Sequence, residues 1–137
     1  MILFELETAM ASIKNFEDLE IWQLARKQSQ AINQLISDKR LKNDFGLINQ
    51  IRNSSGSVMD NIAEGFDREG NKEFINFLSI AKGSNAECRS QFYRCYDNSY
   101  ITQEELDVFV GESKNTWSKN QKFYGLPKKF RIQRAKI

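Results

Sequence analysis

The chain has 137 residues, of which 40% are hydrophobic and 12% aromatic. This length fits a single domain, and the apolar content is sufficient for a buried core. The absence of any run of about 18 apolar residues argues against a membrane-spanning helix. The first eight residues are apolar but acidic, unlike a secretory signal, so the sequence predicts a cytoplasmic protein.

The residue types that bind metals or transfer protons are scarce. The chain has no histidine and two cysteines, Cys88 and Cys95. These cysteines lie about 10 Å apart along one expected helix, too far for an internal disulfide, so both are expected to be free thiols. Carboxylates such as Glu64 and Glu73 lack the histidines of di-metal bundle sites. The sequence therefore predicts no metal, no cofactor and no enzymatic activity.

Charge is distributed unevenly along the chain. Residues 118–137 contain seven basic side chains and no acidic one, whereas the remaining residues contain 13 basic and 18 acidic side chains, a net charge of −5. We expect an N-terminal extension over residues 1–14, a helical bundle over 15–125 and a basic C-terminal tail over 126–137.

The first two helices are expected over residues 16–40 and 47–65. Asn15 is the predicted N-cap of the first. Apolar and small residues at three- and four-residue steps predict its inner face, namely Trp22, Ala25, Ser29, Ile32 and Ile36. In the second, the small residues 54–57 predict the close approach of a neighbouring helix. A phosphate-binding loop is the alternative, but the Walker spacing and its lysine are missing.

The last two helices are expected over residues 72–98 and 103–124. Asn71 is the predicted N-cap of the third helix, and Gly83 inside it predicts tight packing, because a helical glycine costs about 1 kcal/mol relative to alanine. Thr102 and Glu105 fit a capping box at the start of the fourth. Four amphipathic helices joined by short loops predict an all-α, antiparallel up-down-up-down four-helix bundle.

The stretch from Asn61 to Arg68 predicts the corner between the second and third helices. Gly65 is expected to end the helix in the left-handed conformation. Glu64 and Arg68, four residues apart, are expected to form an ion pair if the helix continues past Gly65. The Asn61 amide is expected to bond the free carbonyl groups at the helix end or the start of the next helix.

A corner near residue 68 also sets the register between the second and third helices. Facing positions in the two helices then add up to about 137, which places Arg52 near Ser84 and Glu87. We therefore predict an Arg52–Glu87 ion pair at the edge of the seam, where it contributes more to register than to net stability.

Several blocks of sequence carry a family resemblance. They are Phe16-x-x-Leu19-x-x-Trp22, Phe45-Gly46-Leu47-x-x-Gln50-Ile51-Arg52, Ser57-Val58-x-x-Asn61-Ile62-Ala63-Glu64-Gly65-Phe66-x-Arg68 and Glu73-Phe74-x-x-Phe77-Leu78-x-Ile80-Ala81-x-Gly83-Ser84-x-x-Glu87. Over about residues 14–124 the chain resembles the four-helix-bundle proteins encoded in intervening sequences of bacterial 23S ribosomal RNA genes. The resemblance implies a closed bundle that assembles as a homopentamer. No catalytic residues are implied.

More distant relatives are the accessory proteins of diversity-generating retroelements, which are pentameric and basic and bind nucleic acid and a reverse transcriptase. This chain departs from the family pattern at two places. Asn53-Ser54-Ser55 replaces a second basic residue and small apolar residues, which weakens the expectation of a basic groove on the second helix. Met59-Asp60 lacks the usual proline, which favours a straighter helix.

The basic C-terminal residues are the candidate nucleic-acid-binding site. Cations without neighbouring acids can neutralise phosphates, and interleaved aromatic side chains can stack on unpaired bases. The candidate residues are Lys119, Lys122, Lys128, Lys129, Arg131 and Arg134. They predict a non-enzymatic oligomer that binds RNA or DNA non-specifically. The alternatives are a solvated tail, a tail packed on a neighbouring subunit, and an oligomeric scaffold for a protein partner such as a polymerase.

Overall fold

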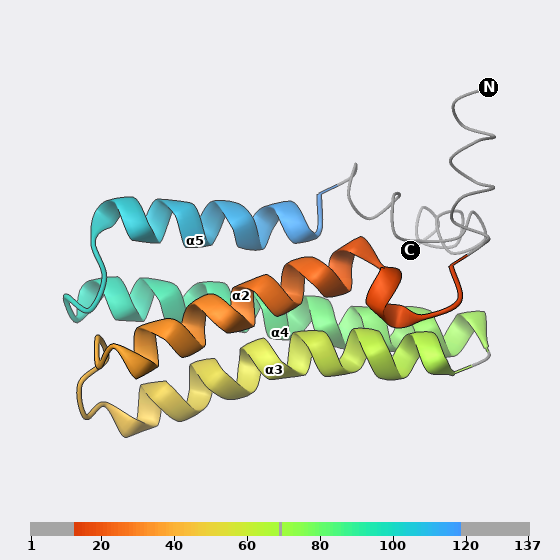
Figure 1. The fold of residues 1–137 in the computed structure, drawn as a ribbon, viewed down its shortest axis with the longest axis horizontal. Helices are drawn as coiled ribbons and strands as arrows, with labels where there is room; N and C mark the ends of the chain where they lie inside the picture. Colours follow the sequence, from red (N-terminus) through yellow and green to blue (C-terminus); the bar gives the residue numbers. More distant parts are fainter. Residues whose placement is uncertain (1–12, 69, 119–137) are drawn as a thin grey trace.

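The computed structural model describes residues 13–68 and 70–118 (Figure 1). This part of the chain is all-α. Its elements are the 3-10 helix η1 (Phe16–Asp18) and the α-helices α2 (Glu20–Ser37), α3 (Phe45–Asp67), α4 (Asn71–Asp97) and α5 (Gln103–Thr116). No helix of the described ranges is long and apolar enough to cross a membrane.

The four predicted helices are confirmed, but three of their starts differ from the prediction. The second helix begins at Phe45, two residues earlier than predicted. The first helix begins at Glu20, because Leu19 has an extended backbone and the preceding turn is a 3-10 helix. Asn15 makes no capping hydrogen bond with its side chain. The third helix begins at Asn71, so Gly70 and not Asn71 occupies the N-cap position.

The start of the fourth helix is confirmed, and its end is earlier than predicted. The Thr102 hydroxyl accepts a hydrogen bond from the Glu105 backbone N–H at 3.2 Å, and the Glu105 carboxylate accepts one from the Thr102 backbone N–H at 2.9 Å. These two bonds form the predicted capping box. Helix α5 ends at Thr116, and the predicted helical residues 119–124 lie outside the described residues.

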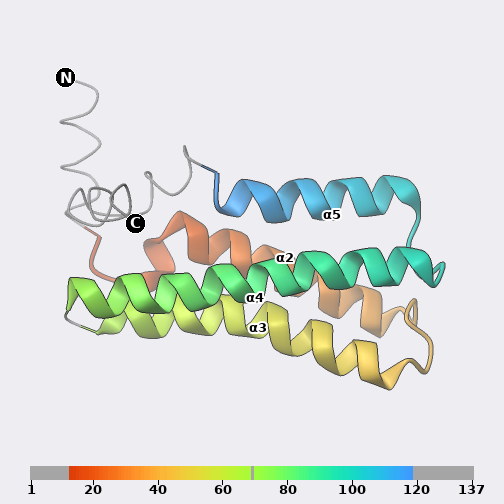
Figure 2. The ribbon, with the colours of Figure 1, turned by 180° about the vertical axis from the view of Figure 1, so that it is seen from behind.

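Each helix packs against its neighbours in the chain, and α5 also contacts α2. The most extensive contact joins α3 and α4, which lie side by side in both views (Figures 1 and 2). Ser57 pairs with Ser84, whereas Ser54, one turn earlier in α3, pairs with Gln91, later in α4. These two helices therefore run in opposite directions.

The core has two apolar clusters separated by buried polar side chains. The cluster nearer the α3–α4 corner includes Val58, Ile62, Phe74 and Leu78, and the other surrounds the fully buried Phe92. Between them every α-helix contributes buried polar residues, a polar belt that comprises Gln28, Ser54, Ser55, Ser84, Asn85, Gln91, Ser113 and Thr116. Such a layer penalises any shift of one helix along another, because the shift would leave buried polar groups unpaired.

This polar belt explains an error in the predicted inner face of the first helix. Ile21 and Gln28 are buried, whereas Trp22 and Ser29 are only half-buried. Gln28 is accommodated because its amide donates a hydrogen bond to the Asn85 side chain at 3.3 Å. Trp22 packs edge-on against Phe16 instead, with the ring centroids 5.1 Å apart. The predicted face is thus confirmed at Ala25 and Ile32, and it is shifted only at positions 21 and 28, which are buried in place of their neighbours.

Gly65 has a different role from the predicted one. No described glycine has a positive φ, and α3 continues two residues beyond Gly65 to Asp67. A Cβ atom at Gly65 would lie only 2.5 Å from Phe77 Cβ and 3.2 Å from Phe74 Cδ1. Glycine is therefore required here by the close approach of α3 and α4, and not by a left-handed helix end.

Candidate functional site

The α3–α4 corner contains the predicted ion pair. Arg68 Nη2 lies 3.2 Å from Glu64 Oε1, and Arg68 Nη1 lies 4.0 Å from Glu73 Oε2. The guanidinium also lies over the Phe77 ring, 5.4 Å from its centroid. Arg68 thus joins both helices at the corner, but its charge is already neutralised by carboxylates. The corner is therefore a structural feature and a poor phosphate site.

Asn61 hydrogen-bonds within its own helix. Its side-chain N–H groups donate to the Ser57 carbonyl oxygen at 2.8 Å and to the Ser57 hydroxyl at 2.9 Å. The prediction that it bonds the free carbonyls at the helix end, or the next helix, is wrong, because α3 extends past it by six residues. Asn61 instead fixes the hydroxyl that pairs with Ser84 across the seam at 2.8 Å.

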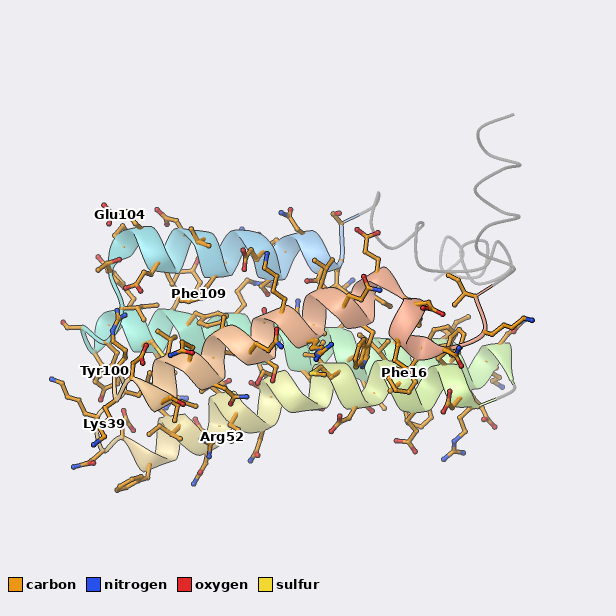
Figure 3. All side chains as sticks on the ribbon, viewed as in Figure 1. Phe16, Lys39, Arg52, Tyr100, Glu104 and Phe109 are labelled. Carbon is orange, nitrogen blue, oxygen red and sulfur yellow. The ribbon has the colours of Figure 1, made fainter. Side chains whose placement is uncertain are left out.

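The predicted Arg52–Glu87 ion pair is absent. The predicted register places Ser57 opposite Ile80, but Ser57 pairs with Ser84, a displacement of about one helical turn. Arg52 (labelled in Figure 3) and Glu87 are both exposed, and neither belongs to any of the ion pairs among the described residues. The corner itself lies close to its predicted place, between Asp67 and Asn71, so the offset arises from how the two helices pack and not from where the chain turns.

A groove of about 520 Å³ follows the seam between α3 and α4. Its lining consists of amide and hydroxyl groups with one carboxylate, from Gln50, Asn53, Ser54, Ser57, Ser84, Glu87 and Gln91. Most of these groups bond one another, as in the 2.6 Å hydrogen bond from Ser54 to Gln91. No cation lines the groove. It can form hydrogen bonds but has no means of neutralising a phosphate.

A network of side chains fastens the opposite end of the bundle. Arg40 Nη2 lies 2.6 Å from Glu105 Oε1, and Arg40 Nε donates to the Tyr100 carbonyl oxygen at 3.2 Å. The Tyr100 hydroxyl donates to Asp44 at 2.9 Å, and Asp44 caps α3 by accepting from the Leu47 N–H. We call these four residues, Arg40, Asp44, Tyr100 and Glu105, the loop clasp. It ties the α2–α3 loop to the α4–α5 loop.

The loop clasp changes the ionisation of its members. The hydrogen bond from Arg40 lowers the pKa of the Glu105 carboxyl, and the backbone bond from Thr102 adds to this. The same Arg40–Glu105 bond raises the pKa of Arg40. The pKa of Tyr100 is raised, chiefly because its hydroxyl proton is bonded to Asp44. The clasp is thus held together by an ionised Glu105 and a protonated Tyr100.

We expect Glu105→Gln to lower stability at pH 7 by at most about 1 kcal/mol, because both partners are about one-third exposed. Glutamine preserves the capping box, so the substitution isolates the charge. A carboxyl with a lowered folded-state pKa stabilises the fold above its unfolded pKa, and this contribution disappears as pH falls through the folded pKa. The difference between wild type and variant in urea unfolding should therefore be present at pH 7 and smaller at about pH 3, below the ordinary glutamate pKa of about 4.3. An equal difference at both pH values would contradict it, and Glu104→Gln is the control.

The two cysteines are free and buried in the structure. Burial raises the pKa of Cys88 to about 12 and that of Cys95 to about 11. Thiols held in the protonated form are poor nucleophiles and poor metal ligands. No group of three His, Cys, Asp or Glu side chains within the described ranges is arranged to hold a metal ion.

The predicted nucleic-acid-binding residues Lys119, Lys122, Lys128, Lys129, Arg131 and Arg134 all lie outside the described residues. The described chain ends at Ser118, just after α5. That end of α5 lies at the same end of the molecule as the start of α2 and the α3–α4 corner (Figure 1).

Sequence reasoning missed both the polar belt and the loop clasp. Glutamine, arginine and asparagine are residue types that usually lie on the surface, so nothing in the sequence marked Gln28, Arg40 and Asn85 as members of these networks.

Comparison with known proteins gives one match. Residues 17–120 match the family described as 23S rRNA-intervening sequence protein. No curated protein and no solved structure matches significantly. The matched region includes all four α-helices, the corner and the loop clasp, so it accounts for nearly the whole described fold. The chain therefore belongs to the 23S rRNA-intervening sequence protein family.

Proposed function

We propose that this protein is a non-enzymatic, oligomeric helical bundle that binds the phosphate backbone of RNA or DNA through its basic C-terminal residues. The charge distribution supports this function: seven cations and no acid in residues 118–137, against a net charge of −5 in the rest of the chain. Phosphate neutralisation with release of counterions supplies most of the free energy of non-specific binding.

Part of the positive charge of the described body is already engaged by other side chains. Three of its arginines, Arg40, Arg68 and Arg94, already bond side chains on neighbouring turns or helices. The groove along α3 and α4 has no cation among its lining residues. The basic C-terminal residues are thus the strongest attractor for a polyanion.

Assembly is the second part of the function. We take the four helices as an up-down-up-down bundle, and the oligomer as the homopentamer that the family resemblance implies. Several large apolar side chains are exposed on the described body, including Phe45 at 67%, Val108 at 55% and Ile80 at 54%. Near Ile80, a Cβ atom at Gly83 would meet nothing within 4 Å, so the prediction of tight packing at Gly83 inside the chain is wrong. An open glycine beside exposed apolar residues favours contact with another protein surface.

Two sets of matched substitutions test the proposed binding. Lys128→Gln, Lys129→Gln and Arg131→Gln together remove three cations from the C-terminal residues. Lys72→Gln, Lys82→Gln and Lys114→Gln together remove three exposed cations from the described body. Fluorescence anisotropy with labelled RNA should show a salt slope reduced by about 3 for the first variant only. Equal losses for both variants would contradict a C-terminal site.

An oligomeric scaffold without a nucleic-acid role is the second candidate, and the exposed apolar residues favour it. Binding of a protein partner that persists at high salt, by a chain that binds no RNA or DNA, would support this candidate over the first. Light scattering on the same samples gives the oligomeric state and shows whether Lys-to-Gln changes disturb assembly.

A further inference from the structure

The end of the bundle that carries the loop clasp contains an open cavity of about 490 Å³. It is lined by Arg40, Tyr96, Asp97, Ser99 and Tyr100, with Ile101 and Thr102. Figure 3 shows Tyr100 and the neighbouring Lys39 at this same end. The volume lies within the range of about 300–1,000 Å³ that is typical of small-molecule sites.

Residues with a strained backbone lie in the two loops that contribute to this cavity, although only Ser99 among them lines it. Lys39, Lys42 and Ser99 have φ values of 57°, 53° and 63°, and they are the only non-glycine residues of the described ranges with positive φ. Lys39 and Ser99 each follow a helix end, where glycine is the favoured residue. A side chain in this conformation costs roughly 1–2 kcal/mol. Strain of this kind clusters at functional sites, and here a lysine occupies a position at which glycine would be less strained.

The cavity presents donors, an acceptor and an aromatic ring. Arg40 uses Nη2 for Glu105 and Nε for the Tyr100 carbonyl oxygen, which leaves about three of its five N–H groups for a ligand. The Asp97 carboxylate is exposed and takes part in none of the hydrogen bonds or ion pairs of the described residues. Tyr96 is 37% exposed, enough to offer part of its ring for stacking.

We propose that this cavity binds a guanosine phosphate unit, with the base stacked on Tyr96, its N–H groups on Asp97 and its O6 and N7 acceptors toward Arg40. Guanine is complementary to these side chains. Its Watson–Crick edge carries adjacent N–H donors, which a carboxylate can accept in bidentate fashion, and arginine is the usual donor to its O6 and N7 atoms. Adenine has an amino group where guanine has O6, and so places a donor toward Arg40. Lys39, which is exposed and precedes Arg40 in the chain, supplies a cation for the phosphate.

The guanosine phosphate unit can be a free nucleotide or an unpaired guanosine of an RNA strand, and the second source rests on the nucleic-acid binding proposed above.

The test uses the full chain with two labelled RNA octamers. Each octamer consists of uridines, with one central guanosine in the first and one central adenosine in the second. A separate NMR titration with GMP and AMP follows the Arg40 Nε–H signal. The variants are Asp97→Asn, Tyr96→Leu and Tyr96→Phe, with Tyr93→Leu as the control, because Tyr93 is exposed on α4 and does not line the cavity.

We expect the guanosine octamer to bind about tenfold more tightly than the adenosine octamer, and Asp97→Asn to abolish this preference. Tyr96→Leu should weaken binding of the guanosine octamer about tenfold, whereas Tyr96→Phe and Tyr93→Leu should not. Equal binding of the two octamers, or equal losses from Tyr96→Leu and Tyr93→Leu, would overturn the proposal. If neither octamer binds at low salt, the proposed backbone binding has failed, and the NMR titration alone decides on the cavity. A shift of the Arg40 Nε–H signal with GMP but not with AMP would support a free-nucleotide site. No shift with either nucleotide would overturn the proposed site.

Discussion

Gly65→Ala is expected to destabilise the fold, and Gly83→Ala to stabilise it, although both replace a glycine inside a helix by the best helix former. At Gly65 the new Cβ would lie 2.5 Å from Phe77 Cβ, an atom fixed to the backbone of α4. The two helices must then move apart along their most extensive contact. Overpacking of this kind costs about 1–3 kcal/mol or more, which exceeds the gain in helix propensity of about 1 kcal/mol.

Gly83→Ala is the matched control for this prediction. Nothing lies within 4 Å of a Cβ atom at Gly83, so the variant should gain about 1 kcal/mol from helix propensity alone. Urea unfolding followed by circular dichroism measures both effects. A stabilised Gly65→Ala variant would contradict the close approach of α3 and α4. A destabilised Gly83→Ala variant would instead indicate that another subunit packs against that face in the oligomer.

The affinity of the full chain for duplex DNA is expected to fall roughly 10³- to 10⁴-fold between 50 and 200 mM salt. Each phosphate contact on a duplex contributes a slope of about −0.9, so seven C-terminal cations correspond to a slope of about −6. Residues 1–117 carry a net charge of −5 and oppose the approach of the polyanion, so we expect most of the slope to come from the C-terminal cations. In an oligomer several C-terminal segments contact one nucleic acid, which steepens the dependence further.

The slope of log affinity against log salt concentration, measured by fluorescence anisotropy, checks this prediction. A slope near zero would show that apolar or hydrogen-bonded contacts supply the binding free energy, and would direct attention to the exposed aromatic residues of α4. Single-stranded RNA of the same length is a useful comparison, because its slope should be shallower, about −0.7 for each contact.

Local signals in the sequence predicted the local structure well. The pair Thr102 and Glu105 identified the start of α5 because a capping box depends only on residues three apart. Glu64 and Arg68 formed the expected ion pair for a similar reason, since their spacing on one helix fixes their distance. Periodicity found all four helices because an apolar face repeats within each segment.

Properties that depend on two segments could not be predicted in the same way. Gly65 looks the same in the sequence whether it provides a positive φ or room for Phe77, and only the packing of α4 distinguishes the two. The Arg52–Glu87 pair failed because facing positions depend on how the two helices pack, and the observed pairing of Ser57 with Ser84 differs from the predicted register by about a turn. Gln28 and Asn85 satisfy each other inside the core, and neither residue type alone indicates burial.

The most direct test of the proposed function compares the full chain with a chain truncated after Gly125. The truncation removes five of the seven C-terminal cations. Anisotropy with labelled structured RNA and duplex DNA at low salt gives the affinities, and light scattering gives the oligomeric state of each protein. We predict that the full chain binds, that the truncated chain binds far more weakly, and that both assemble alike. Failure of the full chain to bind either nucleic acid at low salt, with the oligomer intact, would contradict the proposed function.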